Sequence, residues 1–174
     1  MAISPDISEY AFVSIGANLD SSLGTPADTI AFAMDKLAEL SDAPLLTSSI
    51  YLTSPVDSPK GTPDFHNAMV GLIPRHNETP HSLLRKLQGI ENSAGRTRSG
   101  IINEARTLDL DLVLFGKQTC DDEELQLPHP RALARKFVLV PLCELASEDF
   151  VFPGTDETLA DSLLKIQDQE LKSA

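Results

Sequence analysis

The sequence predicts an α+β domain with a mainly antiparallel sheet and helices packed on its faces. Segments of strand composition interleave with helical segments, but without the regular βαβ rhythm of a doubly wound parallel sheet. The 174 residues, of which 41% are hydrophobic, suffice for one well-filled core. The sequence shows no repeat of fixed period, so we expect a single domain over residues 1–174.

Four segments have the β-branched and aromatic composition of strands. They comprise residues 10–19, 45–53, 65–73 and 107–115. The segment 54–64, rich in Pro, Gly, Ser and Asp, and the segment 121–130 are predicted to be loops. Apolar spacing predicts two late helices, over 132–145 with an interruption at Pro141, and over 158–169.

Two earlier helices are predicted from their start signals. Thr25 and Thr79 are each followed by Pro, and Thr is a favoured N-cap while Pro fits the first helical position. The first helix should run to about Leu40, where a spacing of three or four between apolar residues ends. The second should end before Gly95, since glycine is common just beyond a helix.

The overall charge disfavours nucleic acid as a partner. The chain carries a net charge of −12, whereas nucleic-acid binding depends on a basic surface. Residues 85–136 nevertheless hold nine of the fourteen Lys and Arg, which indicates a local anion site.

No apolar run approaches the roughly 20 residues needed to cross a bilayer. Cys120 and Cys143 lack the spacing of a disulfide framework or zinc site. We expect a cytoplasmic protein without nucleic-acid or membrane partners.

The segment Leu108-Asp109-Leu110-Asp111-Leu112 carries the clearest chemical pattern. Because side chains alternate along a strand, the three leucines face one side and both carboxylates the other. Two carboxylates about 6.6 Å apart along a strand can converge on Mg²⁺, a cation that prefers oxygen ligands. The alternative is a half-buried strand whose outer face happens to be acidic.

Cations and aromatic residues surround this pattern. Arg96, Arg98 and Arg106 precede the acidic strand, and guanidinium groups recognise phosphate oxygens, although structural Arg–Asp pairs are an alternative. His129, in a Pro-His-Pro-Arg segment, is interpreted as a nucleotide contact and not a general base. Two phenylalanines could hold a flat ring whose edge an asparagine amide would read. These residues are Phe65, Phe137 and Asn67.

In order and spacing, six blocks of the sequence match one family. The blocks are Ser14 to Leu19, Ser49 to Pro55, Asp64 to Asn67, Ile90-Glu91 leading to Gly95 to Arg98, Arg106 to Asp111, and Pro128 to Arg131. From about residue 12 to residue 166 the chain resembles 6-hydroxymethyl-7,8-dihydropterin pyrophosphokinase. The resemblance implies a ferredoxin-like core, and a reaction in which ATP gives its diphosphate to the pterin alcohol and leaves as AMP.

The resemblance also implies a role for individual residues. Asp109 and Asp111 would bind two Mg²⁺ ions, and Arg96 and Arg106 would stabilise charge on the transferred group. The ATP-binding residues would be Gln88, Glu91, Arg98, Leu112, His129 and Arg135. Thr53, Pro55, Val56 and Asn67 would frame the pterin between Phe65 and Phe137. We expect a monomer whose partners are these small molecules.

Two alternative functions remain open, one suggested by a departure from the family pattern and one by the fold. Where Trp-Gly-Pro-Arg is common in bacterial members, this chain has Asn103-Glu104-Ala105-Arg106, and it contains no Trp. A catalytically degenerate homologue that binds ATP or a partner is therefore one alternative. A ferredoxin-like RNA-binding module is a second, disfavoured by the 5% aromatic content and the negative charge.

Overall fold

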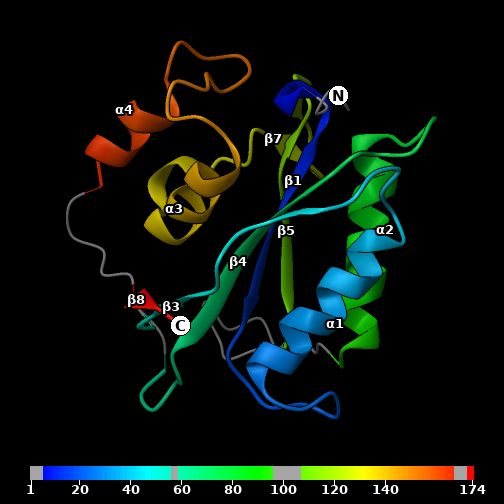
Figure 1. Cartoon of the computed structure of the whole chain (residues 1–174), viewed down its shortest axis with the longest axis vertical. Helices are drawn as coiled ribbons and strands as arrows, with labels where there is room; N and C mark the ends of the chain where they lie inside the picture. The colour runs from blue at the N-terminus through cyan, green and yellow to red at the C-terminus, as the bar shows by residue number, and fades with distance from the viewer. Residues whose placement is uncertain (1–5, 56–58, 96–106, 167–171) are drawn as a thin grey trace.

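The chain folds into an antiparallel sheet with helices on both faces, which confirms the predicted α+β class (Figure 1). The computed structural model describes residues 6–55, 59–95, 107–166 and 172–174. The strands are β1 (Ala11–Ala17), β2 (Leu46–Thr47), β3 (Tyr51–Thr53), β4 (Phe65–Leu72), β5 (Asp109–Phe115), β6 (Cys120–Asp121), β7 (Gln126–Leu127) and β8 (Lys172–Ser173). The helices are α1 (Pro26–Ala38), α2 (Pro80–Ser93), α3 (Lys136–Leu145) and α4 (Leu159–Leu164), with 3-10 turns at Ile7–Glu9 and Ala132–Ala134.

The main sheet has the strand order expected of a ferredoxin-like core. Its order is β5-β1-β4-β3-β8, with β2 also paired to β4, and each of these pairs is antiparallel. Along the chain, the elements of this core are strand β1, helix α1, strands β3 and β4, helix α2 and strand β5. In the sheet, β1 and β4 lie at the centre. Strand β5 lies at one edge of the sheet, so one of its sides is open to other elements.

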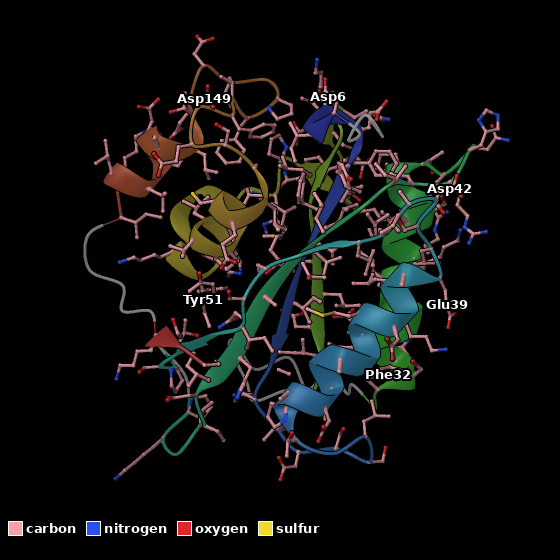
Figure 2. The ribbon with its side chains drawn as sticks, in the orientation of Figure 1. Asp6, Phe32, Glu39, Asp42, Tyr51 and Asp149 are labelled. Atoms are coloured by element: carbon pink, nitrogen blue, oxygen red, sulfur yellow. The ribbon has the colours of Figure 1, made fainter. Side chains whose placement is uncertain are left out.

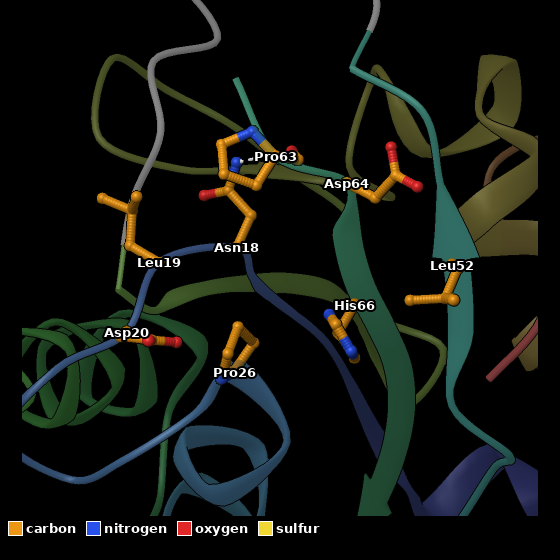
Figure 3. A pocket seen from close by; sticks show the side chains of 8 residues that line it. All are labelled: Asn18, Leu19, Asp20, Pro26, Leu52, Pro63, Asp64 and His66. Atoms are coloured by element: carbon orange, nitrogen blue, oxygen red, sulfur yellow. Dashed lines mark hydrogen bonds between the residues drawn. The ribbon is translucent and has the colours of Figure 1, made fainter. Parts of the chain in front are cut away.

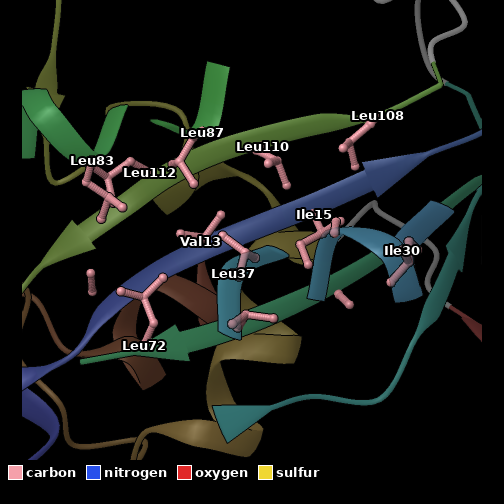
Figure 4. Packing of buried hydrophobic residues seen from close by; sticks show 14 of the residues in the cluster. Val13, Ile15, Ile30, Leu37, Leu72, Leu83, Leu87, Leu108, Leu110 and Leu112 are labelled. Carbon is pink, nitrogen blue, oxygen red and sulfur yellow. The ribbon is translucent and has the colours of Figure 1, made fainter. Parts of the chain in front are cut away.

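Two hydrophobic clusters fill the space on either side of this sheet. On one side, the apolar stripes of α1 and α2 join a cluster that includes Leu108, Leu110 and Leu112, with α2 packed on β5 and α1 on β1 and β4 (Figure 4). On the other side, α3 and α4 pack against a second cluster that includes Phe12 and Met69. The three leucines preceding and within β5 therefore share the face predicted for them.

The predicted helix starts are confirmed. Thr25 and Thr79 accept hydrogen bonds from the backbone N–H groups of Asp28 and Ser82, and Pro occupies the first helical position in both helices. The side chains of Asp28 and Ser82 in turn accept hydrogen bonds from the backbone N–H groups of Thr25 and Thr79. This capping box satisfies N–H groups that a helix start otherwise leaves open. Gly95 follows α2 with a φ of 80°, a left-handed value that glycine adopts without strain.

The predicted strand over 45–53 is wrong in one respect, because it is split into β2 and β3. Between them, the Ser48 hydroxyl accepts a hydrogen bond from the Met69 N–H at 2.8 Å. The side chain thus takes a ladder position that a backbone carbonyl would fill in a continuous strand.

The predicted interruption at Pro141 is also wrong, because α3 continues through this residue. The irregular part lies at the start of the segment, where Ala132–Ala134 forms a 3-10 turn. Burial of Pro141 beside Val138 and Leu142 offsets the hydrogen bond that proline cannot make. The loop predicted over 121–130 is partly wrong, because β6 and β7 form a hairpin over residues 120–127. Among the residues described, no helix is long and apolar enough to span a membrane.

Candidate active site

Asp109 and Asp111 lie on the face of β5 opposite the leucines. Both are partly buried, and in the antiparallel register Asp109 is opposite Gly16 and Asp111 is opposite Ser14. On its other side β1 pairs with β4, where Gly16 is opposite Asn67. One row of the sheet therefore runs from the Asp109 carboxylate across Gly16 to the Asn67 amide.

Gly16 leaves this row without a side chain between the two polar groups. A Cβ placed on Gly16 would lie 3.5 Å from Asn67 Oδ1, so the amide oxygen faces the glycine. The amide nitrogen donates to Thr53 Oγ1 at 2.9 Å and, more weakly, to the Phe65 carbonyl at 3.4 Å. Asn67 is buried, with 4% of its surface exposed, so its orientation is set by these neighbours.

Phe65 and Phe137 come from two different elements beside this row. Phe65 is the first residue of β4 and pairs across the sheet with Thr53, so it shares the face of Asn67. Phe137 lies in the first turn of α3, the helix that packs on this face, and the Arg135 guanidinium lies over its ring at 5.4 Å from the centroid. The structure thus places an amide, a hydroxyl and aromatic rings on the side of the sheet that carries the aspartates.

A carboxylate on α3 holds β3 in place. Glu144 accepts hydrogen bonds from the Ser49 N–H at 2.9 Å, from the Ser49 hydroxyl at 3.1 Å and from the Tyr51 hydroxyl. Tyr51 is opposite Asn67 in the register of β3 and β4, and Figure 2 shows it beside α3. The hydrogen bond to Glu144, assisted by burial, raises the pKa of Tyr51 to about 12, so the phenol stays protonated at neutral pH.

His129 lies along the open edge of β5. Its backbone N–H donates to the Val113 carbonyl at 2.9 Å, and its Nδ1 accepts from the Arg131 N–H at 3.2 Å. The neutral ring therefore carries its proton on Nε2, which is then a donor suited to a phosphate oxygen. Burial, followed by the charges of Arg135 and Arg131, lowers the pKa of His129, whereas Asp109 acts in the opposite direction. The imidazole is thus neutral at pH 7 and close enough to Asp109 to feel its charge.

The predicted ATP-binding residues on α2 are less directly placed. Glu91 is 2% exposed, and its Oε2 accepts the Leu110 N–H at 3.0 Å, so the carboxylate supports the edge of β5. Gln88 is exposed on the same helix, which packs on the leucine side of β5. The Leu112 side chain is buried on that side too, so a nucleotide could reach Leu112 only through its main chain.

Several predicted residues lie outside the described part of the chain, and one neighbour was not predicted. Arg96, Arg98, Arg106 and Val56 are outside the described residues, while Pro55 follows β3 and is partly buried. The hydroxyl of Thr107, two residues before Asp109, is buried and has no hydrogen-bond partner among the residues that the structure describes. A buried polar atom of this kind is a position that a bound group can satisfy.

A separate pocket lies where the strands end beside the start of α1. Its volume is about 680 Å³, and its lining comprises Asn18, Leu19, Asp20, Pro26, Leu52, Pro63, Asp64 and His66 (Figure 3). Leu52 and His66 are cross-strand partners that alternate with Thr53 and Asn67, so they face the other side of the sheet. The aspartate pair and the Asn67 amide therefore belong to a different face, and we place the site there.

The fold and this face together define a class of protein, an α+β domain whose antiparallel sheet carries two aspartates and a buried asparagine amide on one face. Residues 12–147 match the family described as 7,8-dihydro-6-hydroxymethylpterin-pyrophosphokinase (HPPK), and the chain belongs to this family.

Named relatives and solved structures agree with this assignment. The chain is 37% identical over 145 residues to the 2-amino-4-hydroxy-6-hydroxymethyldihydropteridine pyrophosphokinase of Haemophilus influenzae, covering 83% of this chain and 86% of that protein. It is 38% identical over 141 residues to the protein of the same name in Pseudomonas aeruginosa, covering 80% and 82%. Its fold matches HPPK-DHPS of Plasmodium falciparum with a TM-score of 0.65 at 14% identity, over 90% of this chain and 44% of that one. The chain thus spans less than half of that solved protein, and this likeness supports the fold alone.

Proposed function

We propose that this chain transfers diphosphate from ATP to 6-hydroxymethyl-7,8-dihydropterin, giving AMP and the pterin diphosphate, a step of folate biosynthesis. The observation that carries the proposal is the row that joins Asp109, through Gly16, to the buried Asn67 amide. One end of this row suits a metal-bound polyphosphate and the other a heterocycle with donors and acceptors on its edge. Membership of the pyrophosphokinase family supports both assignments.

The acidic end fits Mg²⁺ by its donor set. Asp109 and Asp111 offer carboxylate oxygens on one face, two residues apart, while the leucines that alternate with them face the core. Two ions bound there would neutralise phosphate charge and stabilise the oxygens of attack and departure. The buried hydroxyl of Thr107, which finds no partner within the described ranges, adds a polar group beside this end.

The edge of β5 supplies the nucleotide contacts. The Nε2–H of His129 would donate to a phosphate oxygen, and Arg135 would add positive charge that spreads over the same group. Main-chain groups of Leu112 would read the base, since its side chain is buried elsewhere. The remaining residues in the proposed nucleotide and phosphate set are Gln88, Glu91, Arg96, Arg98 and Arg106.

The other end of the row would bind the pterin. Asn67 offers a carbonyl and an amide on one side chain, which match the acceptors and donors on a pterin edge. Its bond to Thr53 fixes which atom points where, because the amide nitrogen is already the donor to that hydroxyl. Phe65 and Phe137 would cover the faces of the ring, with Pro55 and Val56 at its rim.

In the proposed reaction, the pterin hydroxyl oxygen forms a bond to the β-phosphorus of ATP. The bond from that phosphorus to the oxygen bridging it to the α-phosphate breaks, AMP leaves with that oxygen, and the hydroxyl proton is released to solvent. The protein contributes alignment of the two substrates and charge stabilisation, which are the main sources of rate in such transfers. We further propose that residues 1–174 act as one domain and that the protein is a monomer. Light scattering after size exclusion measures the molar mass and therefore tests the monomer directly.

The test is to incubate the protein with ATP, Mg²⁺ and hydroxymethyldihydropterin and to separate the nucleotides. The proposal predicts AMP together with a diphosphorylated pterin of matching amount, and no AMP when the pterin is omitted. Formation of ADP in place of AMP would show transfer of a single phosphate. Binding of ATP without any product would show a catalytically inactive homologue, and either result would contradict the proposal.

A further inference from the structure

A cluster of three possible metal ligands lies outside the proposed active site, between α2 and the β6–β7 hairpin. His81 is the second residue of α2, Cys120 belongs to β6, and Asp122 lies in the turn that follows β6. One ligand atom from each side chain lies within 4.8 Å of the others. The fold therefore joins residues 41 positions apart in sequence at one point on the surface.

The carboxylate of Asp122 is held in a fixed orientation. Its Oδ1 accepts the backbone N–H groups of Glu124 and Leu125, at 2.9 Å and 2.8 Å. The other oxygen, Oδ2, faces His81 Nε2 at 2.8 Å and Cys120 Sγ at 3.4 Å. A single oxygen thus lies between an imidazole nitrogen and a thiol, two groups that bind metals once their protons are displaced.

These distances are close to those of a coordination sphere. Bonds of about 2.0 to 2.3 Å to N, O and S in a tetrahedron place neighbouring ligand atoms roughly 3.3 to 3.6 Å apart. Small shifts of the His81 and Cys120 side chains would therefore open the space that a cation needs. Both are only partly buried, and Asp122 is exposed, so a water molecule can complete a fourth position.

The ligand types select the metal. Imidazole, thiolate and carboxylate together suit Zn²⁺ or Co²⁺, whereas Mg²⁺ prefers oxygen ligands such as the Asp109–Asp111 pair. We propose that His81, Cys120 and Asp122 form a zinc-type metal site, distinct from the proposed magnesium site, that fastens α2 to the β6–β7 hairpin.

The location gives the site a structural consequence. The same two elements are bridged by an ion pair between Arg85 and Glu124 at 3.5 Å, so a metal would reinforce an existing junction. Exposed ion pairs contribute little, whereas a coordinated metal binds only the folded arrangement and stabilises it. Metal binding should therefore raise the melting temperature of the chain. This proposal of a metal site does not depend on the proposed transfer reaction.

The test uses Co²⁺ as a spectroscopic probe, because a thiolate ligand gives a near-ultraviolet charge-transfer band that oxygen and nitrogen ligands do not. The full chain, stripped with EDTA and kept in saturating Mg²⁺, is titrated with Co²⁺ and then with Zn²⁺. We expect the band to saturate at one equivalent of Co²⁺ and to disappear as Zn²⁺ displaces it. Zn²⁺ should also raise the melting temperature by several degrees.

Matched variants assign the ligands. Cys120→Ser should abolish the band, and His81→Ala should weaken Co²⁺ binding at least tenfold. Cys143→Ser and His76→Ala, which change the other free cysteine and an exposed histidine, should leave both readouts unchanged. Circular dichroism and melting in EDTA establish that each variant is folded, and His81→Gln replaces His81→Ala if that variant is not.

Two results would overturn the proposal. Absence of a thiolate band in the wild type would leave the three side chains as a hydrogen-bonded cluster. Persistence of the band in folded Cys120→Ser would place the metal at another thiol.

Discussion

The three hydrogen bonds that Glu144 accepts from Ser49 and Tyr51 predict a measurable loss when this carboxylate is changed to Gln. Glutamine keeps the shape but replaces one acceptor oxygen with a donor, which would then face an N–H or O–H group. A hydrogen bond to a charged acceptor contributes about 1.5 to 3 kcal/mol when shielded. Glu144 is exposed, so solvent reduces this, and we expect Glu144→Gln to cost about 1 kcal/mol.

For a chain of this size that loss lowers the melting temperature by about 2 to 4 °C. The Michaelis constant for the pterin should also rise, by about fivefold for each 1 kcal/mol, because β3 carries Thr53 beside Asn67. Differential scanning fluorimetry and initial rates at varied pterin provide the two measurements. Glu148→Gln, at an exposed position just beyond α3, is the control and should change neither.

The Glu144–Tyr51 pair also predicts how the difference in melting temperature between wild type and Glu144→Gln varies with pH. Loss of solvation beside β3 acts to raise the pKa of Glu144, but the hydrogen bonds from Tyr51 and Ser49 outweigh it and lower this pKa from its usual 4.5. This contribution is present above pH 4.5 and is lost as pH falls through the lower folded value. The pKa of Tyr51 is raised from 10.0 to about 12, so its contribution is complete below pH 10 and is lost as pH approaches 12. A difference in melting temperature of zero at pH 7, or one that grows in acid, would refute this account of the α3–β3 contact.

Three further changes test other parts of the structure. Glu91→Ala leaves the Leu110 N–H of an edge strand unsatisfied in a buried position, and should cost about 2 to 4 kcal/mol in urea unfolding; a cost below about 0.5 kcal/mol would contradict this. Gly116→Ala should cost about 1 to 3 kcal/mol by the same measurement, because φ is 56° and the added Cβ would lie 2.8 Å from the backbone oxygen of Ser8; unchanged stability would show that the turn can relax freely. Asn67→Ala should lower kcat/KM for the pterin about 10- to 100-fold and leave the ATP Michaelis constant unchanged, whereas equal effects on both substrates would remove the amide from the pterin site.

The acidic strand illustrates what alternation in sequence can predict. The pattern of Leu and Asp from residue 108 to 112 correctly assigned one face to the core and the other to the carboxylates. It gave no sign of the bulge that follows, in which Val113 has no partner between the pairs Phe12–Leu114 and Val13–Leu112. The bulge sends Leu114 to the α3 side, because one extra residue reverses the face of everything after it.

Local signals predicted the helix starts but not the contacts between distant segments. A Thr-Pro pair specifies a cap through atoms within four residues, so Thr25 and Thr79 could be assigned from sequence. The Glu144–Tyr51 contact joins residues 93 positions apart, and it exists only because α3 packs on the face of β3 and β4. The family resemblance predicts a nucleotide role for Glu91, but no sequence pattern indicates that its carboxylate also supports a strand edge.

The most direct test of the central claim is the Mg²⁺ dependence of AMP formation in Asp109→Asn and Asp111→Asn. Each change keeps the shape of the side chain and removes one anionic ligand, so both variants should retain the wild-type circular dichroism spectrum. We predict that each lowers the rate at least 100-fold, or about 3 kcal/mol, and shifts the Mg²⁺ requirement upward. Asp121→Asn, which changes an exposed aspartate of β6, should retain full activity. Wild-type rates with unchanged Mg²⁺ dependence in either folded variant would contradict the role assigned to the acidic pair.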